Sequence, residues 1–168
     1  GIPADWKRSV DRGLDKALTT LGKQKQVNAL VYVVNSADQS FLHALEEAWV
    51  YGKKNDVVVI IGSTSFPTID WVSVMAWTVF EEFKKTLSRN ILELSDLSDT
   101  TKLVNLITSQ IALPPELGGF LRKPMAEYEY LISDILLPLW ADFLVILLSA
   151  FFAWTINWAL ENNEIQNF

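Results

Sequence analysis

The stretch DVVVIIG, residues 56–62, decides the fold. Five consecutive apolar residues, all β-branched, lie between Asp56 and Gly62. Such residues favour strands, and an apolar run without polar alternation indicates a strand that is buried on both faces of its sheet. A sheet that is buried on both faces needs other elements packed against each side, and the helices expected around this segment indicate an α/β domain whose sheet is covered by helices.

A second strand and two helices surround this segment on its N-terminal side. The run NALVYVV, residues 28–34, is apolar and rich in β-branched residues, so it predicts another buried strand. Apolar residues three or four apart predict an amphipathic helix over residues 5–21, closed by Gly22. Its apolar stripe consists of Trp6, Val10, Leu14, Leu18 and Leu21. Asp38 supplies an N-cap for a further helix between the two strands.

The chain after Gly62 predicts a third strand and another helix. A turn around Pro67 leads to an apolar run over residues 69–77, which is compatible with a hairpin partner of the preceding strand. Thr78 and Glu81 have the spacing of a capping box and predict the start of a helix. The apolar face of that helix consists of Phe80, Phe83, Leu87, Ile91 and Leu94.

One more helix completes the predicted domain. Ser95 or Ser98 opens it, and Pro114-Pro115 stops it, because proline cannot continue a helix. Strands that alternate with helices, with one hairpin among them, indicate a mixed sheet covered by helices. A last helix, with Pro124 in its first turn, connects this domain to the C-terminal segment.

The C-terminal segment, residues 136–160, reads LLPLWADFLVILLSAFFAWTINWAL and has Asp142 as its only formal charge. About 20 apolar residues suffice for a helix to cross a bilayer, whereas buried core helices have shorter apolar runs. At about 1.5 Å per residue, Trp140 and Trp158 lie about 27 Å apart along a helix. With Trp154 beside Trp158, this spacing matches an aromatic belt at each membrane face. The segment therefore predicts one transmembrane helix.

Four segments follow from these patterns. They are an α/β domain over residues 1–112, a loop and linking helix over 113–135, a transmembrane helix over 136–160 and a short polar tail over 161–168.

Composition excludes several classes of function. The net charge is −6, of which three charges belong to the C-terminal segment and tail, so the domain has no basic surplus of the kind that binds nucleic acid. The chain has no cysteine and one histidine, which excludes thiolate metal sites and argues against zinc. Gly62-Ser63-Thr64-Ser65 follows a strand, as nucleophiles often do, but no predicted helix follows it. We expect no cofactor and no catalytic residue.

Three carboxylates are the remaining candidates for a metal site. Asp38 and Asp56 come just before a helix and a strand, and Asp70 comes early in the third strand. The ends of neighbouring sheet elements can converge, and oxygen-rich clusters suit Ca²⁺ or Mg²⁺. The alternative is that Asp38 caps a helix and that Asp56 and Asp70 are ordinary turn or edge residues.

The second helix and strand resemble a known family. Trp49-Val-Tyr-Gly52, followed by Lys-Lys-Asn55-Asp56-Val-Val-Val-Ile-Ile, is similar to the segment W-x-x-G-x-x-N-x-x-V of TPM domains, and the order of elements agrees over about residues 4–111. The resemblance implies an α/β/α sandwich outside the cytoplasm on a C-terminal span, with roles in photosystem assembly and repair or as auxiliary subunits of membrane complexes. It also implies phosphatase activity or divalent-metal binding for some members. No family metal ligand can be matched here residue by residue.

Two hypotheses about function follow. The first is a non-enzymatic accessory subunit that the span holds in a membrane complex, with the lipid bilayer and other subunits as partners. Its contact surface would include Trp49, Tyr51, Tyr128 and Tyr130, since aromatic residues concentrate in interfaces, although Trp49 fits a core position equally well. The second is a membrane-tethered, metal-dependent phosphatase-like hydrolase, whose turnover would be lost in Asp56→Ala.

The sequence gives opposing indications of topology. Arg122-Lys123 lies close before the span and favours the cytoplasmic side, and the tail beyond the span has no Lys or Arg. The family resemblance and the absence of an initiator methionine favour export. We expect a single-pass membrane protein with its domain on the extracytoplasmic side.

Overall fold

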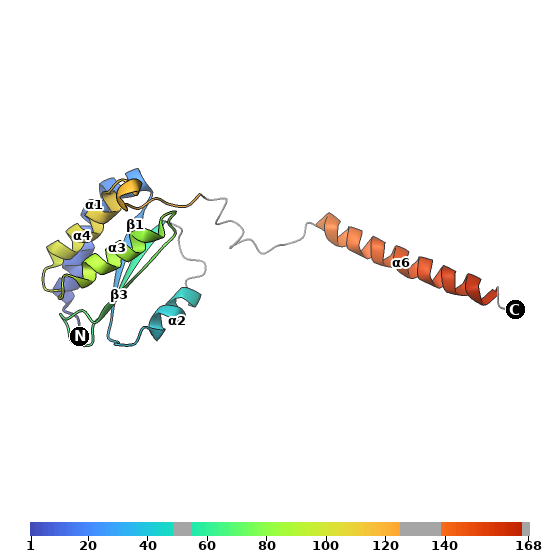
Figure 1. Ribbon diagram of the computed structural model, residues 1–168, viewed down its shortest axis with the longest axis horizontal. Coiled ribbons are helices and arrows are strands. Elements are labelled where there is room, and N and C mark those ends of the chain that lie inside the picture. The colour runs from blue at the N-terminus through green and yellow to red at the C-terminus, as the bar shows by residue number, and fades with distance from the viewer. Residues whose placement is uncertain (49–54, 125–138, 166–168) are drawn as a thin grey trace. The chain divides into compact units, whose positions relative to one another are not determined.

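The computed structural model describes residues 1–48, 55–124 and 139–165 (Figure 1). The chain divides into two compact units, Gly1–Tyr128 and Glu129–Phe168. The first unit holds a sheet with its helices, and the described residues of the second, 139–165, form a long helix.

A three-stranded mixed sheet forms the centre of the first unit. Strand β2 (Asp56–Gly62) lies between β1 (Asn28–Val34) and β3 (Trp71–Ala76). Strand β1 runs parallel to β2, and β3 pairs with β2 as an antiparallel neighbour. The predicted mixed sheet is therefore confirmed, and the third strand is the hairpin partner of the second.

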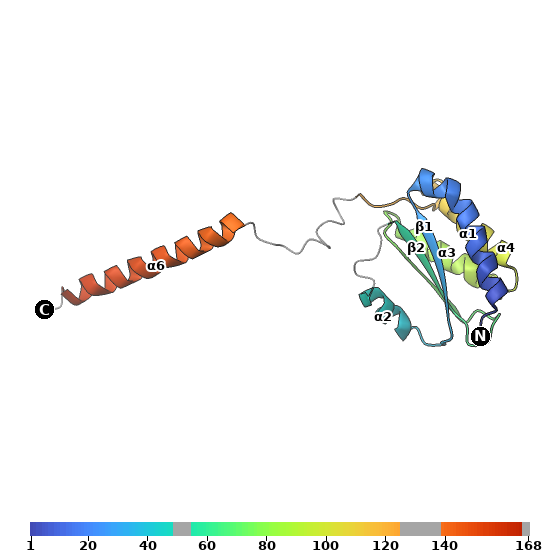
Figure 2. The ribbon, with the colours of Figure 1, turned by 180° about the vertical axis from the view of Figure 1, so that it is seen from behind.

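Strand β2 is buried along its whole length because its two rows of side chains enter two different clusters. Val57, Val59 and Ile61 join the larger cluster, formed with helices α1 (Ala4–Lys25), α3 (Glu81–Leu92) and α4 (Thr100–Ala112). Val58 and Ile60 join the smaller one, together with Trp71 and with Leu42 and Leu45 of α2 (Ser40–Ala48). Figure 2 shows α2 on one side of the sheet and the other three helices on the opposite side. This is the α/β/α arrangement that the run of β-branched residues predicts.

The end of α1 differs from the prediction. The helix continues through Gly22 to Lys25, and Gln26 takes the left-handed conformation, with φ of 51°, that ends it. A Cβ at position 22 would lie 3.3 Å from the carbonyl oxygen of Val27. Glycine at this position therefore allows the backbone at Val27 to pass close to α1, and it does not end the helix. The prediction that Gly22 closes the helix is wrong.

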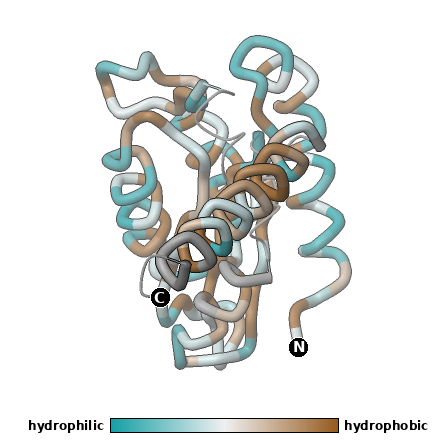
Figure 3. Tube along the Cα trace, turned by 90° about the vertical axis from the view of Figure 1, so that its right-hand side faces the viewer, coloured by the Kyte–Doolittle hydropathy of each residue, from teal (hydrophilic) through white to brown (hydrophobic). Residues whose placement is uncertain are grey.

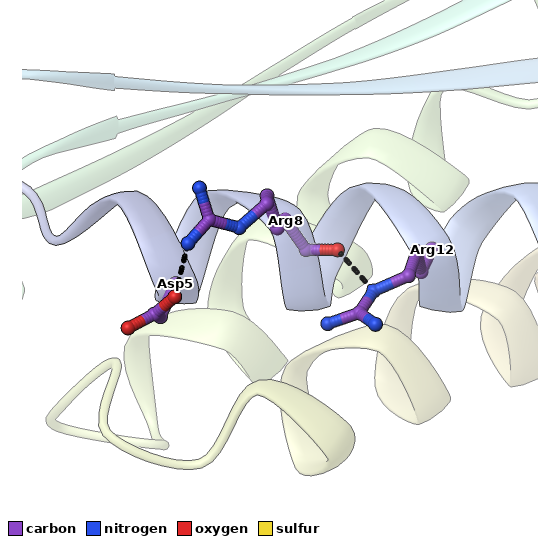
Figure 4. A network of polar contacts seen from close by, with 3 residues as sticks. All are labelled: Asp5, Arg8 and Arg12. Carbon is purple, nitrogen blue, oxygen red and sulfur yellow. Dashed lines mark hydrogen bonds and ion pairs between the residues drawn. The ribbon is translucent and has the colours of Figure 1, made fainter.

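Charged residues near the start of α1 make contacts within the helix. Arg8 forms an ion pair with Asp5, and Nε of Arg12 donates a hydrogen bond of 3.1 Å to the carbonyl oxygen of Arg8 (Figure 4). Exposed pairs of this kind add little stability, so the helix is held by its apolar stripe.

The predicted start of α3 is also wrong. The helix begins at Glu81 after Phe80, and no side chain caps it. A capping box requires Glu at the third helical position, whereas Glu81 occupies the first. Thr78 is fully buried, and its hydroxyl donates to the carbonyl oxygen of Leu121 at 3.0 Å instead.

Helix α4 is capped by a residue that the sequence pattern did not indicate. Asp99 accepts a hydrogen bond of 2.9 Å from the backbone N–H of Lys102. Ser95 lies in the left-handed region, with φ of 64°, and the N–H of Ser98 donates to Asp96 at 2.7 Å. Neither serine caps the helix, so the prediction of Ser95 or Ser98 is wrong.

The segment after α4 closes one end of the large cluster. Helix α4 ends at Ala112, as the two prolines predict, and a short 3₁₀ helix, η1 (Pro115–Leu117), follows. Phe120 is fully buried against Phe83, with ring centroids 5.5 Å apart. Residues 113–123 therefore belong to the packing of the first unit.

The second unit contains helix α6 (Leu139–Ile165). The predicted transmembrane helix begins three residues earlier, at positions outside the described residues. The predicted linking helix lies mostly outside them as well. Figure 3 shows hydrophobic residues over much of α6, whereas the helices of the first unit alternate between hydrophobic and hydrophilic positions.

Candidate functional site

Asp56 is the first residue of β2 and lies at the amino ends of the two parallel strands. It is 5% exposed, and its carboxylate accepts a hydrogen bond of 3.0 Å from the side-chain amide of Asn28, its register partner on β1. This carboxylate therefore joins two strand ends.

Asp38 and Asp70 lie at the opposite end of the sheet, where β1 and β2 finish and β3 begins. Asp38 follows β1 and accepts hydrogen bonds from the hydroxyl and the N–H of Ser40, at 2.7 and 2.9 Å. Asp70 precedes β3 and accepts from the N–H and the hydroxyl of Thr64, both at 2.7 Å. Because these donors favour the charged form, the pKa of each carboxyl lies below its ordinary value. Both groups are ionised near pH 7.

The three carboxylates do not form one site. Strand β2 has seven residues, and at about 3.3 Å per residue it separates Asp56 from the other edge by about 20 Å. A single Ca²⁺ or Mg²⁺ needs its oxygen ligands within about 2–2.6 Å of the ion. Within residues 1–48, 55–124 and 139–165, no group of three acidic or histidine side chains could hold a metal ion.

The edge that carries Asp38 and Asp70 has one further polar feature. Ser63 is 6% exposed, and its hydroxyl has no hydrogen-bond partner among the described residues. Next to it, the indole of Trp71 covers Gly62 and donates a hydrogen bond of 2.9 Å to the carbonyl oxygen of Ser36. A Cβ at Gly62 would lie 2.0 Å from this indole nitrogen. The structural role of the Gly62–Trp71 pair was not predicted, since only the strand register brings the two residues together.

A polar groove of about 770 Å³ runs between α1 and α4. At its floor the helices are close, because a Cβ at Gly13 would lie 3.0 Å from Val104. The hydroxyl of Thr108, which lines the groove, donates to the carbonyl oxygen of Val104 on its own helix. The groove supplies no charged cluster or nucleophile arrangement that would define a chemistry.

The predicted partner-binding aromatic residues Trp49, Tyr51, Tyr128 and Tyr130 lie outside the described residues. The basic pair before the span lies within them. The guanidinium of Arg122 donates to the side-chain oxygen of Asn55 at 3.0 Å. The ammonium of Lys123 lies 4.9 Å from the ring centroid of Trp77.

Helix α6 carries the most distinctive surface of the described chain. Its stretch Trp140–Leu160 has a mean hydropathy of 2.0, and none of it is buried. The belt residues Trp140, Trp154 and Trp158 are 68%, 63% and 59% exposed. A continuous apolar surface of this length is costly in water, and the helix is long and apolar enough to cross a bilayer. The prediction of one C-terminal candidate span is confirmed.

Four small or polar residues of α6 lie on one side of the helix, with apolar residues between them. At about 100° per residue, Asp142, Ser149, Ala153 and Asn157 fall within a sector of about 80°, which also contains Leu139, Ile146 and Leu160. The hydroxyl of Ser149 donates to the carbonyl oxygen of Val145, so it is satisfied inside the helix. Large apolar residues cover the opposite side, namely Leu144, Leu147, Phe151, Trp154 and Trp158.

Comparison of the chain with family models, curated proteins and solved structures found no match. The similarity to TPM domains, and everything it implies about location and partners, therefore stays a prediction from the residues quoted above.

Proposed function

We propose that this protein is a non-enzymatic accessory subunit of a membrane protein complex, anchored by one C-terminal span. The observation that carries the proposal is the surface of α6, which is apolar on most sides and unburied from Trp140 to Leu160. Such a helix is stable in hydrocarbon, where only a lipid or another apolar helix can cover it.

The composition of one side of α6 supports a protein partner in addition to lipid. Helices associate in membranes through small residues that allow close approach and through polar side chains that bond across the interface. Ser149 and Ala153 have the small-xxx-small spacing, and Asp142 and Asn157 extend the same face in both directions. Polar residues within spans tend to face other helices rather than lipid. We call this set the polar face of α6.

A matched pair of variants tests this proposal. The full chain carries an affinity tag and is isolated from its native membranes in a mild detergent, and co-isolated proteins are identified by mass spectrometry. Ala153→Ile adds bulk to the polar face, whereas Ala159→Ile makes the same change about 120° around the helix. We expect a defined set of membrane proteins to accompany the parent chain and Ala159→Ile, and to be depleted several-fold with Ala153→Ile. Isolation of the parent chain as a monomer would contradict the proposal.

The TPM resemblance suggests that this complex is photosynthetic and that the protein is an assembly or repair factor. Photosystem proteins among the co-isolated partners would support this. The resemblance also suggests that the α/β domain lies on the extracytoplasmic side. Protease added to sealed vesicles of known orientation tests this placement, because only an outward-facing domain is digested.

The alternative, a metal-dependent hydrolase, has no supporting arrangement in the described part of the chain. Asp56 lies at one edge of the sheet, and Asp38 and Asp70 lie at the other.

A further inference from the structure

We propose that one end of the α/β domain rests on the membrane surface and binds anionic lipid headgroups. We call this end the exit face. It consists of the end of α1, the segment from Leu113 to Lys123 and the adjoining residues Val79 and Phe80, and it includes the last described residues before the connection to α6.

Hydrogen bonds to backbone carbonyl groups connect the parts of the exit face. The N–H of Val79 donates to the carbonyl oxygen of Leu121 at 2.8 Å. The ammonium of Lys25, at the end of α1, donates to the carbonyl oxygens of Leu113 and Phe120 at 3.0 and 3.4 Å. Segments that are up to 95 residues apart in the sequence thus form one surface.

Exposed apolar side chains concentrate on this face. Among the described residues of the first unit, eight large hydrophobic side chains are exposed, and five of them lie here. These five are Val79, Phe80, Leu113, Leu117 and Leu121. Leu117 is the most exposed, at 68%. The other three, Tyr32, Phe41 and Leu92, lie on separate elements.

Basic residues belong to the same segments as the apolar ones. Lys25 and Arg122 line a depression of about 250 Å³ together with Leu121. Lys23 is exposed in the last turn of α1, on the other side of the helix from Lys25, and Lys123 follows Arg122. Asp56 also lies at this end, but it is buried and accepts a hydrogen bond from Asn28. Glu81 forms an ion pair with Lys84, which leaves Glu82 and Glu116 as the acidic residues without an ion pair to another described residue.

This combination fits a lipid surface better than a protein. Interfacial segments insert apolar side chains at the boundary between headgroups and acyl chains, and flanking Lys and Arg side chains bind anionic headgroups. The connection to α6 keeps the domain near the bilayer, since the 14 residues 125–138 reach at most about 50 Å when fully extended. Tethering raises the effective concentration of the surface that the exit face would meet.

Fluorescent labels at two positions test this inference in the full chain. Because the chain has no cysteine, Leu117→Cys and Thr101→Cys each place a single label. Thr101 is exposed at the other end of α4. Each labelled protein is reconstituted into vesicles that contain a headgroup-nitroxide lipid as quencher, with either neutral phosphatidylcholine alone or a mixture with anionic phosphatidylglycerol. A label at Leu121→Cys provides a second reporter on the exit face.

We expect several-fold stronger quenching at position 117 than at 101, and stronger quenching in anionic than in neutral vesicles. Lys23→Glu should reduce the quenching at 117 to the neutral-vesicle level. Lys7→Glu, the same change at the other end of α1, should leave it unchanged. The inference is overturned if positions 117 and 101 are quenched alike, if anionic lipid has no effect, if the label is shielded only by an added protein, or if the chain does not enter the bilayer.

Discussion

At the scale of single residues, close backbone contacts and local hydrogen bonds account for two positions whose importance the sequence pattern did not reveal. Gly119 is buried against the carbonyl of Leu113. Thr64 is exposed and binds the carboxylate of Asp70. Each leads to a measurable expectation.

Gly119→Ala should destabilise the α/β domain. The added Cβ would lie 1.8 Å from the carbonyl oxygen of Leu113, a backbone atom that cannot move without displacing the exit-face segment. We expect a loss of about 1–3 kcal/mol in the free energy of unfolding, as for other overpacked sites. Guanidinium unfolding of the full chain in detergent, followed by near-UV circular dichroism, measures it. Gly1→Ala, where no atom lies within 4 Å of the new Cβ, is the control. Equal stability of the two variants would contradict this packing.

Thr64→Val should raise the pKa of Asp70. The backbone N–H of Thr64 is the main cause of the lowered pKa, and the hydroxyl is the second. Valine keeps the N–H and removes the hydroxyl, so the pKa should rise while staying below the ordinary value. Titration of the carboxyl carbon by NMR measures the change. Thr101→Val is the control, and an unchanged pKa in Thr64→Val would contradict the assigned contact.

The sign of the pH effect follows from the direction of this shift. Because folding lowers the pKa of Asp70, its contribution to stability is present above the unfolded-state pKa and is lost as the pH falls through the folded-state value. Thr64→Val should therefore reduce the acid sensitivity of folding, and acid titration of the folded fraction of both proteins checks this.

At the scale of helices and strands, the sequence predicts which elements exist better than where they begin. The five consecutive β-branched residues of β2 require apolar neighbours on both faces, so the covered sheet could be predicted from this run and the order of the elements. Helix starts depend on the conformation of one or two residues. At α3, Thr78 has the residue type and spacing of an N-cap, but its hydroxyl donates to the carbonyl oxygen of Leu121, which is 43 residues away in the sequence.

The directions of the strands explain why the three carboxylates do not form one metal site. Their residue types indicate oxygen ligands, but only the direction of each strand decides at which end of the sheet each carboxylate lies. Asp56 begins β2, whereas Asp70 precedes an antiparallel strand that starts where β2 ends. The two residues therefore lie at opposite ends of β2, and the parallel pairing of β1 with β2 also separates Asp56 from Asp38.

Substitution of Asp99, the observed N-cap of α4, should lower the free energy of unfolding more than substitution of Ser98, one of the predicted caps. Asp99→Ala removes the acceptor of the N–H of Lys102, and loss of such a cap costs about 1 kcal/mol. Ser98→Ala leaves this bond in place and should cost clearly less. Unfolding free energies of the two variants test the assignment, and a larger loss in Ser98→Ala would assign the cap to the serine instead.

At the scale of the whole molecule, the chain combines a domain that buries its apolar residues in its own core with a helix whose apolar residues are exposed. The large cluster packs helices α1, α3 and α4 on the sheet, whereas Trp140–Leu160 has no buried residue. The candidate span could be predicted from the sequence because hydropathy and length need no tertiary information. The partners that cover the polar face of α6 could not be predicted, since they belong to other molecules.

A charge in the middle of α6 should weaken membrane insertion more than a charge near its end. Ala150→Arg places a cation near the centre of the Trp140–Leu160 stretch, where insertion scales assign a cost of about 2.5–3.5 kcal/mol. Ala159→Arg places it near the interface, where the side chain can reach the headgroups. We expect a lower membrane-integrated fraction after alkaline extraction for Ala150→Arg than for Ala159→Arg. Equal extraction of both variants would contradict a span centred near residue 150.

The depth profile of α6 in a bilayer tests the central claim most directly. Nitroxide labels at single cysteines introduced one at a time along residues 140–160 of the cysteine-free chain report depth by their relative access to oxygen and to a water-soluble nickel complex. For a span, depth should rise to one maximum near Ala150 and fall toward Trp140 and Trp158. A helix lying in the interface would instead give a depth that oscillates with a period of about 3.6 residues and has no central maximum, and this result would contradict the account.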